Sequence, residues 1–208
     1  TDADGAVGYD YTYVWKINGT DIGESGSTLD GDHFDKGDDV VCTVIPGDGD
    51  DEGDAVDSNT VTIDNTAPSI SSVSISPANP SVSDTLTCSY SGYSDVDGDS
   101  DSSTFEWTIG GSTVGTSNTL AGVFVVGNLV SCTVSPFDGE DKGDDVSDDV
   151  TIENTAPEVI EVTLSPSTVY TDDTITAAVN SSDEDGDGVI LSYEWYVDGS
   201  LVGETGTS

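Results

Sequence analysis

Three runs of alternating carboxylates each lie about ten residues before a tryptophan: Asp2-Ala-Asp4, Asp95-Val-Asp97-Gly-Asp99 and Asp183-Glu-Asp185-Gly-Asp187. Aspartates that alternate along a glycine-containing loop can direct several oxygen atoms at one hard cation such as calcium. The third run continues through Gly188 to Glu194 and so matches the whole twelve-residue calcium-loop pattern. We therefore predict calcium ligands at Asp2, Asp4, Asp95, Asp97, Asp99, Asp183, Asp185, Asp187 and Glu194. Glu194 adjoins Trp195 on an expected strand, where the alternative is a solvent-facing side chain.

The elements that must position these runs repeat about every 90 residues. Asn65-Thr-Ala-Pro68 returns as Asn154-Thr-Ala-Pro157, and Cys42-Thr-Val44 returns as Cys132-Thr-Val134. We predict a partial repeat with later strands, a complete repeat and a partial repeat with early strands, at residues 1–64, 65–153 and 154–208. The chain is then expected to be a segment of a longer array.

The complete repeat contains about seven short segments of alternating or continuous hydrophobicity, separated by Gly, Asp and Pro. Examples are Leu86–Tyr90, Phe105–Ile109, the apolar run Val123–Val126 and Val130–Val134. No helical periodicity competes with this pattern. It predicts an all-β fold made of antiparallel β-sandwiches.

A second acidic segment follows another expected strand in two of the repeats. Pro46–Asp54 aligns with Pro136–Asp144, and both are rich in Asp, Glu and Gly. In a sandwich of this type, such a loop lies at the same end as the loop with alternating aspartates and the linker from the preceding repeat. Carboxylates that meet there repel one another without a cation and become ligands with one. This interpretation adds the predicted ligands Asp48, Asp54, Asp138 and Asp144.

The order Cys88, Trp107, Cys132 across the complete repeat is similar to that of the immunoglobulin superfamily. The resemblance implies tandem immunoglobulin-like sandwiches and a disulfide between Cys88 and Cys132 that packs on the tryptophan. Two buried free thiols are the alternative. The third repeat has Ala177 at the position of Cys88, which predicts no bridge there. Cys42 needs a partner before residue 1 or is itself a free thiol.

The Asp-x-Asp-Gly-Asp loops and the Asn-Thr-Ala-Pro linkers together resemble calcium-bridged repeats of prokaryotic surface proteins, such as PKD-like and cadherin-like modules. That resemblance implies extracellular repeats in which calcium at each junction turns a flexible string of domains into a rod. The alternative is that the acidic loops are the solvated surface of a salt-adapted protein.

The charge balance narrows the possible partners. Asp and Glu number 42 against three lysines and no arginine, and the formal net charge is −39. Phosphate recognition needs Lys and Arg, so we expect no nucleic acid and no anionic membrane surface as a partner. We also expect no membrane insertion, because no apolar stretch approaches the roughly 20 residues of a bilayer span. Disorder is not expected, because tryptophan, tyrosine and β-branched residues recur at fixed positions.

No catalytic constellation stands out, and we predict that the protein is not an enzyme. His33 is the single histidine and falls in an expected surface corner. A glycosidase-like carboxylate pair is possible by residue type but would need a cleft. Trp15, Trp107 and Trp195 share one repeat position, which favours core residues over a sugar platform. The N-glycosylation pattern occurs at Asn18 and Asn180.

The predicted function is structural: a calcium-stiffened stalk, adhesin shaft, sheath or filament on a cell surface or secreted. Its expected partners are neighbouring repeats of the same longer chain or filament. The alternative is a calcium-dependent adhesion module that binds a carbohydrate or a cell-surface protein, with Tyr93 and Phe137 as the aromatic candidates. A polymer in which the partial repeats of two chains complete each other is a third hypothesis.

Overall fold

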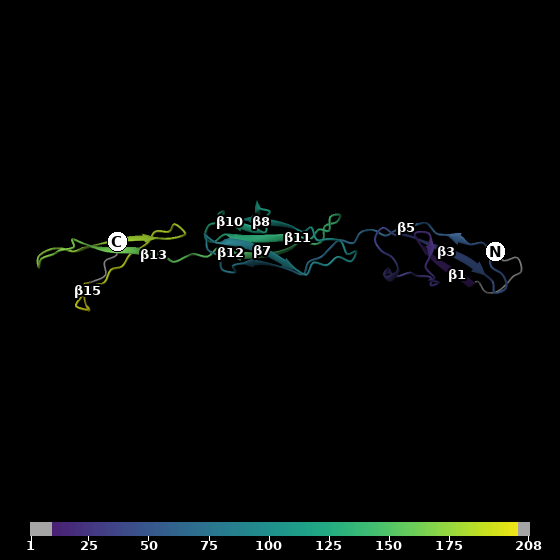
Figure 1. The fold of residues 1–208 in the computed structure, drawn as a ribbon, viewed down its shortest axis with the longest axis horizontal. Helices are drawn as coiled ribbons and strands as arrows, with labels where there is room; N and C mark the ends of the chain where they lie inside the picture. The colour runs from purple at the N-terminus through teal and green to yellow at the C-terminus, as the bar shows by residue number, and fades with distance from the viewer. Residues whose placement is uncertain (1–9, 204–208) are drawn as a thin grey trace. The chain divides into compact units, whose positions relative to one another are not determined.

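The computed structural model describes residues 10–203, in which strands and turns predominate and the one helix is a single 3-10 turn, Gly31–His33 (Figure 1). The prediction of an all-β fold is confirmed. Two compact units can be distinguished. The first consists of the chain up to Ile70, Gly92–Ser103 and Ser135–Asp144, and the second of Ser71–Ser91, Thr104–Val134 and the chain from Asp145. Within residues 10–203, no helix has the length and hydropathy to cross a bilayer.

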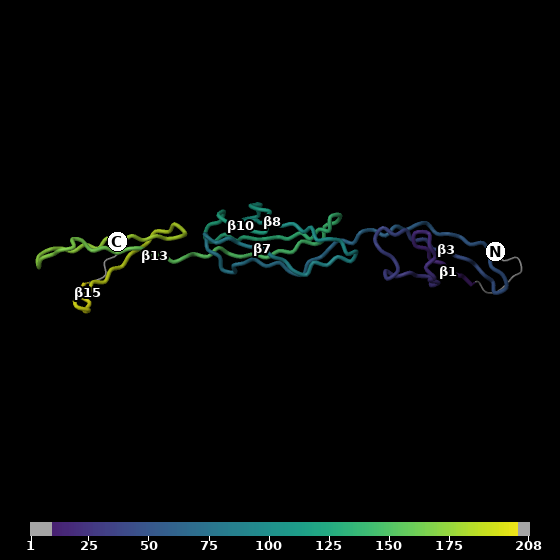
Figure 2. Tube along the Cα trace, viewed as in Figure 1, coloured from purple at the N-terminus to yellow at the C-terminus, as the bar shows by residue number. Residues whose placement is uncertain are grey.

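An immunoglobulin-like antiparallel sandwich is formed by β6 to β12, and we call it the central sandwich; Figure 2 traces the chain through β7, β8 and β10. One sheet has the order β10-β7-β6 and the other the order β12-β11-β8-β9. The strands are β6 (Ser72–Ser76), β7 (Thr85–Ser91), β8 (Thr104–Ile109), β9 (Ser112–Gly115), β10 (Thr119–Ala121), β11 (Leu129–Ser135) and β12 (Val146–Thr151).

Inward side chains of alternating positions form the core of the central sandwich. Leu86, Trp107 and Val130 are fully buried, as the period of two predicts. A disulfide joins Cys88 on β7 to Cys132 on β11 across the two sheets, with Cα atoms 6.4 Å apart. The alternative of two free thiols is therefore wrong. Closing a loop of this length stabilises the fold by about 4 kcal/mol on the chain-entropy estimate.

The apolar run Val123–Val126 is not a strand, contrary to the sequence prediction. The neighbouring strand β10 ends before it, and the run leads into a turn at Gly127, whose φ is +82°. Phe124 is buried, but Val125 is 64% exposed. The Val125 amide donates to Asn128 Oδ1 at 3.0 Å and closes the turn. The run is a loop with one inward anchor, because its other side chains find no sheet to cover them.

The first unit contains the sheet β2-β1-β3-β4, in which β5 also pairs with β3. These strands are β1 (Asp10–Ile17), β2 (Thr20–Asp21), β3 (Asp39–Gly47), β4 (Val56–Asp57) and β5 (Val61–Thr62). Trp15 Nε1 donates to the Gly26 carbonyl at 2.8 Å, as Trp107 Nε1 donates to the Ser117 carbonyl at 2.8 Å. Trp107 is fully buried, which confirms its predicted core role, whereas Trp15 and Trp195 are only partly buried among the described residues. Cys42 is a free thiol opposite Trp15.

Two hairpins follow the central sandwich in the chain. They are β13 (Glu158–Ser165) with β14 (Thr176–Ser182), and β15 (Trp195–Val197) with β16 (Ser200–Gly203). Ala177 on β14 lies opposite Leu164, so no bridge forms at this position. Val162 and Leu164 are each 57% exposed. Within the described residues, these hairpins therefore lack the second layer that buries the same pattern in the central sandwich.

Candidate metal centre

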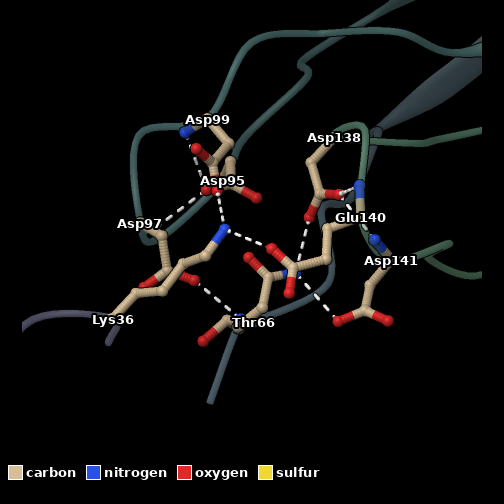
Figure 3. A network of polar contacts seen from close by, with 9 residues as sticks. Lys36, Thr66, Asp95, Asp97, Asp99, Asp138, Glu140 and Asp141 are labelled. Carbon is tan, nitrogen blue, oxygen red and sulfur yellow. Dashed lines mark hydrogen bonds and ion pairs between the residues drawn. The ribbon is translucent and has the colours of Figure 1, made fainter. Parts of the chain in front are cut away.

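Three segments that are far apart in the sequence meet in the first unit. Asp95–Asp99 lies in the loop between β7 and β8, and Asp138–Asp144 lies in the loop between β11 and β12. The third segment is the linker Asp64–Pro68, which precedes β6. Figure 3 shows polar side chains of all three turned toward one another, together with Lys36. We call this group the junction cluster.

The run Asp95–Asp99 folds around its own first carboxylate. Asp95 Oδ1 accepts from the amide of Asp97 at 2.9 Å and from the amide of Asp99 at 3.1 Å. Gly98 takes the left-handed conformation, φ +78°, that lets the loop turn between them. As a result, one ligand oxygen from each of the three aspartates lies within 4.8 Å of the others. Three oxygens at this spacing match the ligands that a calcium ion gathers.

Three buried oxygens of the first unit have no hydrogen-bond partner among the described residues. They are Asp95 Oδ2, Asn65 Oδ1 and the Tyr93 hydroxyl, and they have almost no solvent contact. Burial raises the pKa of the Tyr93 phenol, and the negative charge of Asp95 adds to the effect. Buried polar atoms normally have a hydrogen-bond partner, because an unpaired one has lost its hydrogen bonds to water and gained none within the protein. Among these atoms, the carboxylate oxygen of Asp95 and the amide oxygen of Asn65 are of the kinds that calcium binds.

The linker is tied to both acidic loops. The Thr66 amide donates to Asp97 Oδ2 at 2.6 Å. Asn65 Nδ2 donates to Asp138 Oδ2 and to Asp141 Oδ2, each at 2.9 Å. The bond from Asn65 is the largest cause that lowers the pKa of Asp138 to about 2. Because the amide nitrogen faces the second loop, the amide oxygen of Asn65 is left for another partner.

Backbone contact fixes the same linker against the second loop. A Cβ atom placed on Gly143 would lie 1.8 Å from the carbonyl oxygen of Pro68, far inside van der Waals contact. Gly143 N also donates to the Pro136 carbonyl at 3.0 Å, which holds the loop in this shape. Only glycine permits so close an approach of two backbones.

Lys36 adds a positive charge that pairs with both acidic loops of the junction cluster. Its Nζ lies 2.8 Å from Asp99 Oδ2 and 2.8 Å from Glu140 Oε2 (Figure 3). The hydrogen bonds to Asp99 and then to Glu140 raise the pKa of this lysine further above its ordinary value. Lys36 therefore remains charged and joins the two acidic loops to the turn before β3.

The run Asp183–Asp187 repeats the same local turn in the second unit. Asp183 Oδ1 accepts from the amide of Asp185 at 2.9 Å and from the amide of Asp187 at 3.2 Å. The Thr155 amide donates to Asp185 Oδ2 at 2.5 Å, as Thr66 does to Asp97. Asp185 Oδ1 is buried without a partner. Within residues 10–203, however, only Asp95, Asp97 and Asp99 gather ligand oxygens within 4.8 Å.

The remaining predicted ligands are spread over separate surroundings. Asp48 Oδ1 accepts from the amides of Asp50 and Asp51, each at 2.9 Å, and these bonds lower the pKa of Asp48. Asp54 and Asp144 are exposed. Glu194 is exposed as well and accepts a hydrogen bond from the Tyr196 hydroxyl at 2.7 Å. The predicted ligands Asp2 and Asp4 lie outside the described residues.

Sequence analysis did not name five members of the junction cluster as site residues: Lys36, Asn65, Thr66, Glu140 and Asp141. A signal existed for Asn65, because it opens the repeated Asn-Thr-Ala-Pro linker. Lys36 is one of only three lysines in the chain, which was also a signal. Nothing in the sequence paired Lys36 with Glu140, which follows it by more than one hundred positions.

Comparison with known proteins adds little. No protein-family model matches the chain, and no curated protein matches it. Among solved structures, the chain is similar to the FN1–FN3 domains of chicken CNTN1, with 13% identity and a TM-score of 0.32, over 100% of this chain and 77% of that chain. A TM-score this low carries no weight for the site or for function. The fold assignment rests on the strand pairings described above.

Proposed function

We propose that this is a structural extracellular protein in which calcium ties each immunoglobulin-like repeat to the linker before it. The proposed repeats are residues 1–64, 65–153 and 154–208, within a stalk, adhesin shaft, sheath or filament. The observation that carries the proposal is the gathering of three carboxylates within 4.8 Å in the first unit, together with buried oxygens of the same unit that have no partner among the described residues. Asp95, Asn65 and Tyr93 supply these oxygens.

The residues of the junction cluster would have separate roles in binding calcium and in fixing the linker. Asp95, Asp97 and Asp99 would hold the ion, with Asn65 Oδ1 as the oxygen that belongs to the linker. Thr66 fixes the linker, because its backbone amide donates a hydrogen bond to the Asp97 carboxylate. Calcium would supply two positive charges and thereby remove the repulsion among the loop carboxylates. A linker held at both loops loses rotational freedom, which is the physical meaning of stiffening.

Three features support an extracellular setting. The Cys88–Cys132 disulfide persists best in an oxidising compartment. A net charge of −39 keeps the chain soluble and is balanced best by cations of the medium. Calcium sites of moderate affinity are also loaded best where calcium is abundant. The proposed partners are neighbouring repeats of the same array.

The adhesion alternative has less support. Calcium-dependent binding of a carbohydrate would favour exposed aromatic rings beside the acidic loops. Tyr93 and Phe137 are both partly buried, and the Phe137 carbonyl accepts from the Ser102 amide at 2.8 Å within the fold. Neither ring therefore offers an open platform.

Thermal unfolding of the full chain in excess EDTA and in calcium, at fixed ionic strength, tests the proposal. We expect calcium to raise the midpoint, because an ion that binds only the folded state stabilises it. The double substitution Asp97→Asn with Asp99→Asn should abolish that rise. The matched control is Asp149→Asn with Asp172→Asn, two exposed aspartates outside the acidic loops. If the wild-type midpoint is the same in EDTA and in calcium, the metal role is wrong and the loops are a salt-adapted surface.

A further inference from the structure

Lys36 binds a carboxylate of the junction cluster that a metal ion would also bind. Its Nζ lies 2.8 Å from Asp99 Oδ2, and Asp99 is one of the three gathered carboxylates. The same Nζ lies 2.8 Å from Glu140 Oε2, on the other acidic loop. The side chain of Asp99 is 36% exposed and that of Glu140 is 61% exposed, so solvent screens the pair with Glu140 more than the pair with Asp99. One ammonium group thus pairs with one carboxylate of each acidic loop without any ion from solution.

The turn that carries Lys36 does not itself require a lysine. The matching turn of the central sandwich has Val126 at this position. Gly37 N donates to the Ile63 carbonyl at 2.8 Å, just as Gly127 N donates to the Ile152 carbonyl at 2.9 Å. Since the two turns share their backbone bonds and differ in this side chain, the lysine serves its ion pairs and not the fold of the turn.

A second cation beside Asp99 must share its carboxylate with Lys36. Two positive charges a few ångströms apart repel, and the repulsion lowers the affinity for whichever arrives second. The lysine is covalently attached and therefore always present. A metal ion that binds the Asp95–Asp99 loop must overcome repulsion from the Lys36 ammonium group or displace that group from Asp99.

We propose that Lys36 sets the affinity of the Asp95–Asp97–Asp99 site, as an internal cation that holds the junction cluster together without metal and weakens metal binding. This inference rests on the proposed function, because it concerns the same site. It assigns to Lys36 a positioning and affinity-determining role that goes beyond the ligands themselves. The lysine weakens metal binding, but it keeps the two acidic loops tied to each other and to the turn before β3 when calcium is scarce.

Calcium titration by calorimetry tests this role. All variants carry Asp183→Asn with Asp185→Asn, so that the other acidic loop does not contribute. Lys36→Gln should raise calcium affinity by about tenfold, the scale expected from removing one nearby positive charge. Lys16→Gln is the matched control, because it removes the same charge from an ion pair with Asp57, at 3.3 Å, that involves neither acidic loop. Lys36→Arg should retain the original affinity.

A second readout separates this role from a purely structural one. In EDTA, Lys36→Gln should melt below Lys16→Gln, because it has lost the cation that pairs with both Asp99 and Glu140. In saturating calcium the difference should disappear. Equal calcium affinity in both variants would overturn the Lys36 inference and leave the calcium site intact. Absence of calcium binding in every variant, Lys36→Gln included, would overturn the proposed function and this inference with it.

Discussion

The loops Asp95–Asp99 and Asp183–Asp187 have the same local structure and different surroundings. In each loop, the carboxylate of the first aspartate accepts hydrogen bonds from two backbone amides of the same loop. The carboxylate of the middle aspartate accepts a hydrogen bond from the backbone amide of a linker threonine. Only the first loop gathers its carboxylates within 4.8 Å, among the residues that the structure describes. Among the same described residues, only the linker beside the first loop carries an asparagine that bonds to a second acidic loop. Local sequence therefore builds the turn, and neighbouring segments complete the site.

The two linker asparagines show the same division. Asn65 bonds to Asp138 and Asp141, whereas Asn154 is exposed and its Nδ2 donates only to the Thr155 carbonyl, at 2.6 Å, among the bonds described. Both residues open an identical Asn-Thr-Ala-Pro tetrad. The same side chain is thus a bridge in one place and a surface group in the other. Paired substitutions at equivalent positions test this difference between the two linkers and their loops.

The largest effect is expected from Gly143→Ala, because the added methyl group would collide with the Pro68 carbonyl. The linker must move away from the second loop, and we expect a loss of roughly 2 kcal/mol in the free energy of unfolding. Gly188→Ala is the matched change near the other acidic run, where a Cβ would meet nothing within 4 Å. Urea unfolding of both variants measures the difference. Equal stabilities would show that the linker does not pack on Gly143.

An intermediate effect is expected from Asn65→Ala, which deprives two aspartates of their shared donor and removes a candidate ligand oxygen. We expect the melting temperature to fall by roughly 5 °C and the stabilisation by calcium to shrink. Asn154→Ala should change neither quantity. Scanning calorimetry of both variants, with calcium and with EDTA, provides the comparison. Similar losses in the two variants would remove the distinction between the linkers.

The smallest effect is a pH dependence confined to acid. The pKa of Asp138 is lowered to about 2 from 3.8, chiefly because Asn65 donates to its carboxylate. A lowered folded-state pKa means that the ionised group stabilises the fold above the unfolded value, and that this contribution is lost as the pH falls from about 4 toward 2. Melting temperatures measured in EDTA between pH 5 and 2 should fall across this window in the wild type.

Asn65→Ala provides the control for that pH dependence. Without the amide donor, the pKa of Asp138 should return toward its ordinary value, and the fall in melting temperature across this window should become shallower. Asn154→Ala should retain the wild-type slope. A slope that is unchanged in Asn65→Ala would mean that other carboxylates cause the acid sensitivity.

Much of the architecture was predictable because its signals are local. Alternating apolar residues predicted the strands around Leu86, Trp107 and Val130, and resemblance to the immunoglobulin pattern predicted the Cys88–Cys132 bridge. The exception was Val123–Val126, whose hydrophobicity suggested a strand. Whether this run forms a strand depends on whether a sheet is available to cover it, and four residues do not show that.

The sequence by itself determined the period of the repeat, the strand pattern and the two aspartate turns, because each follows from side chains and backbone within about ten residues. Only the tertiary structure decided that Lys36, Asn65 and Glu140 meet at one loop and not at the other. Those contacts join segments separated by tens of residues, and their existence depends on how strands bring loop ends together. The same motif can therefore be a gathered oxygen cluster or an open turn, according to which segments lie beside it.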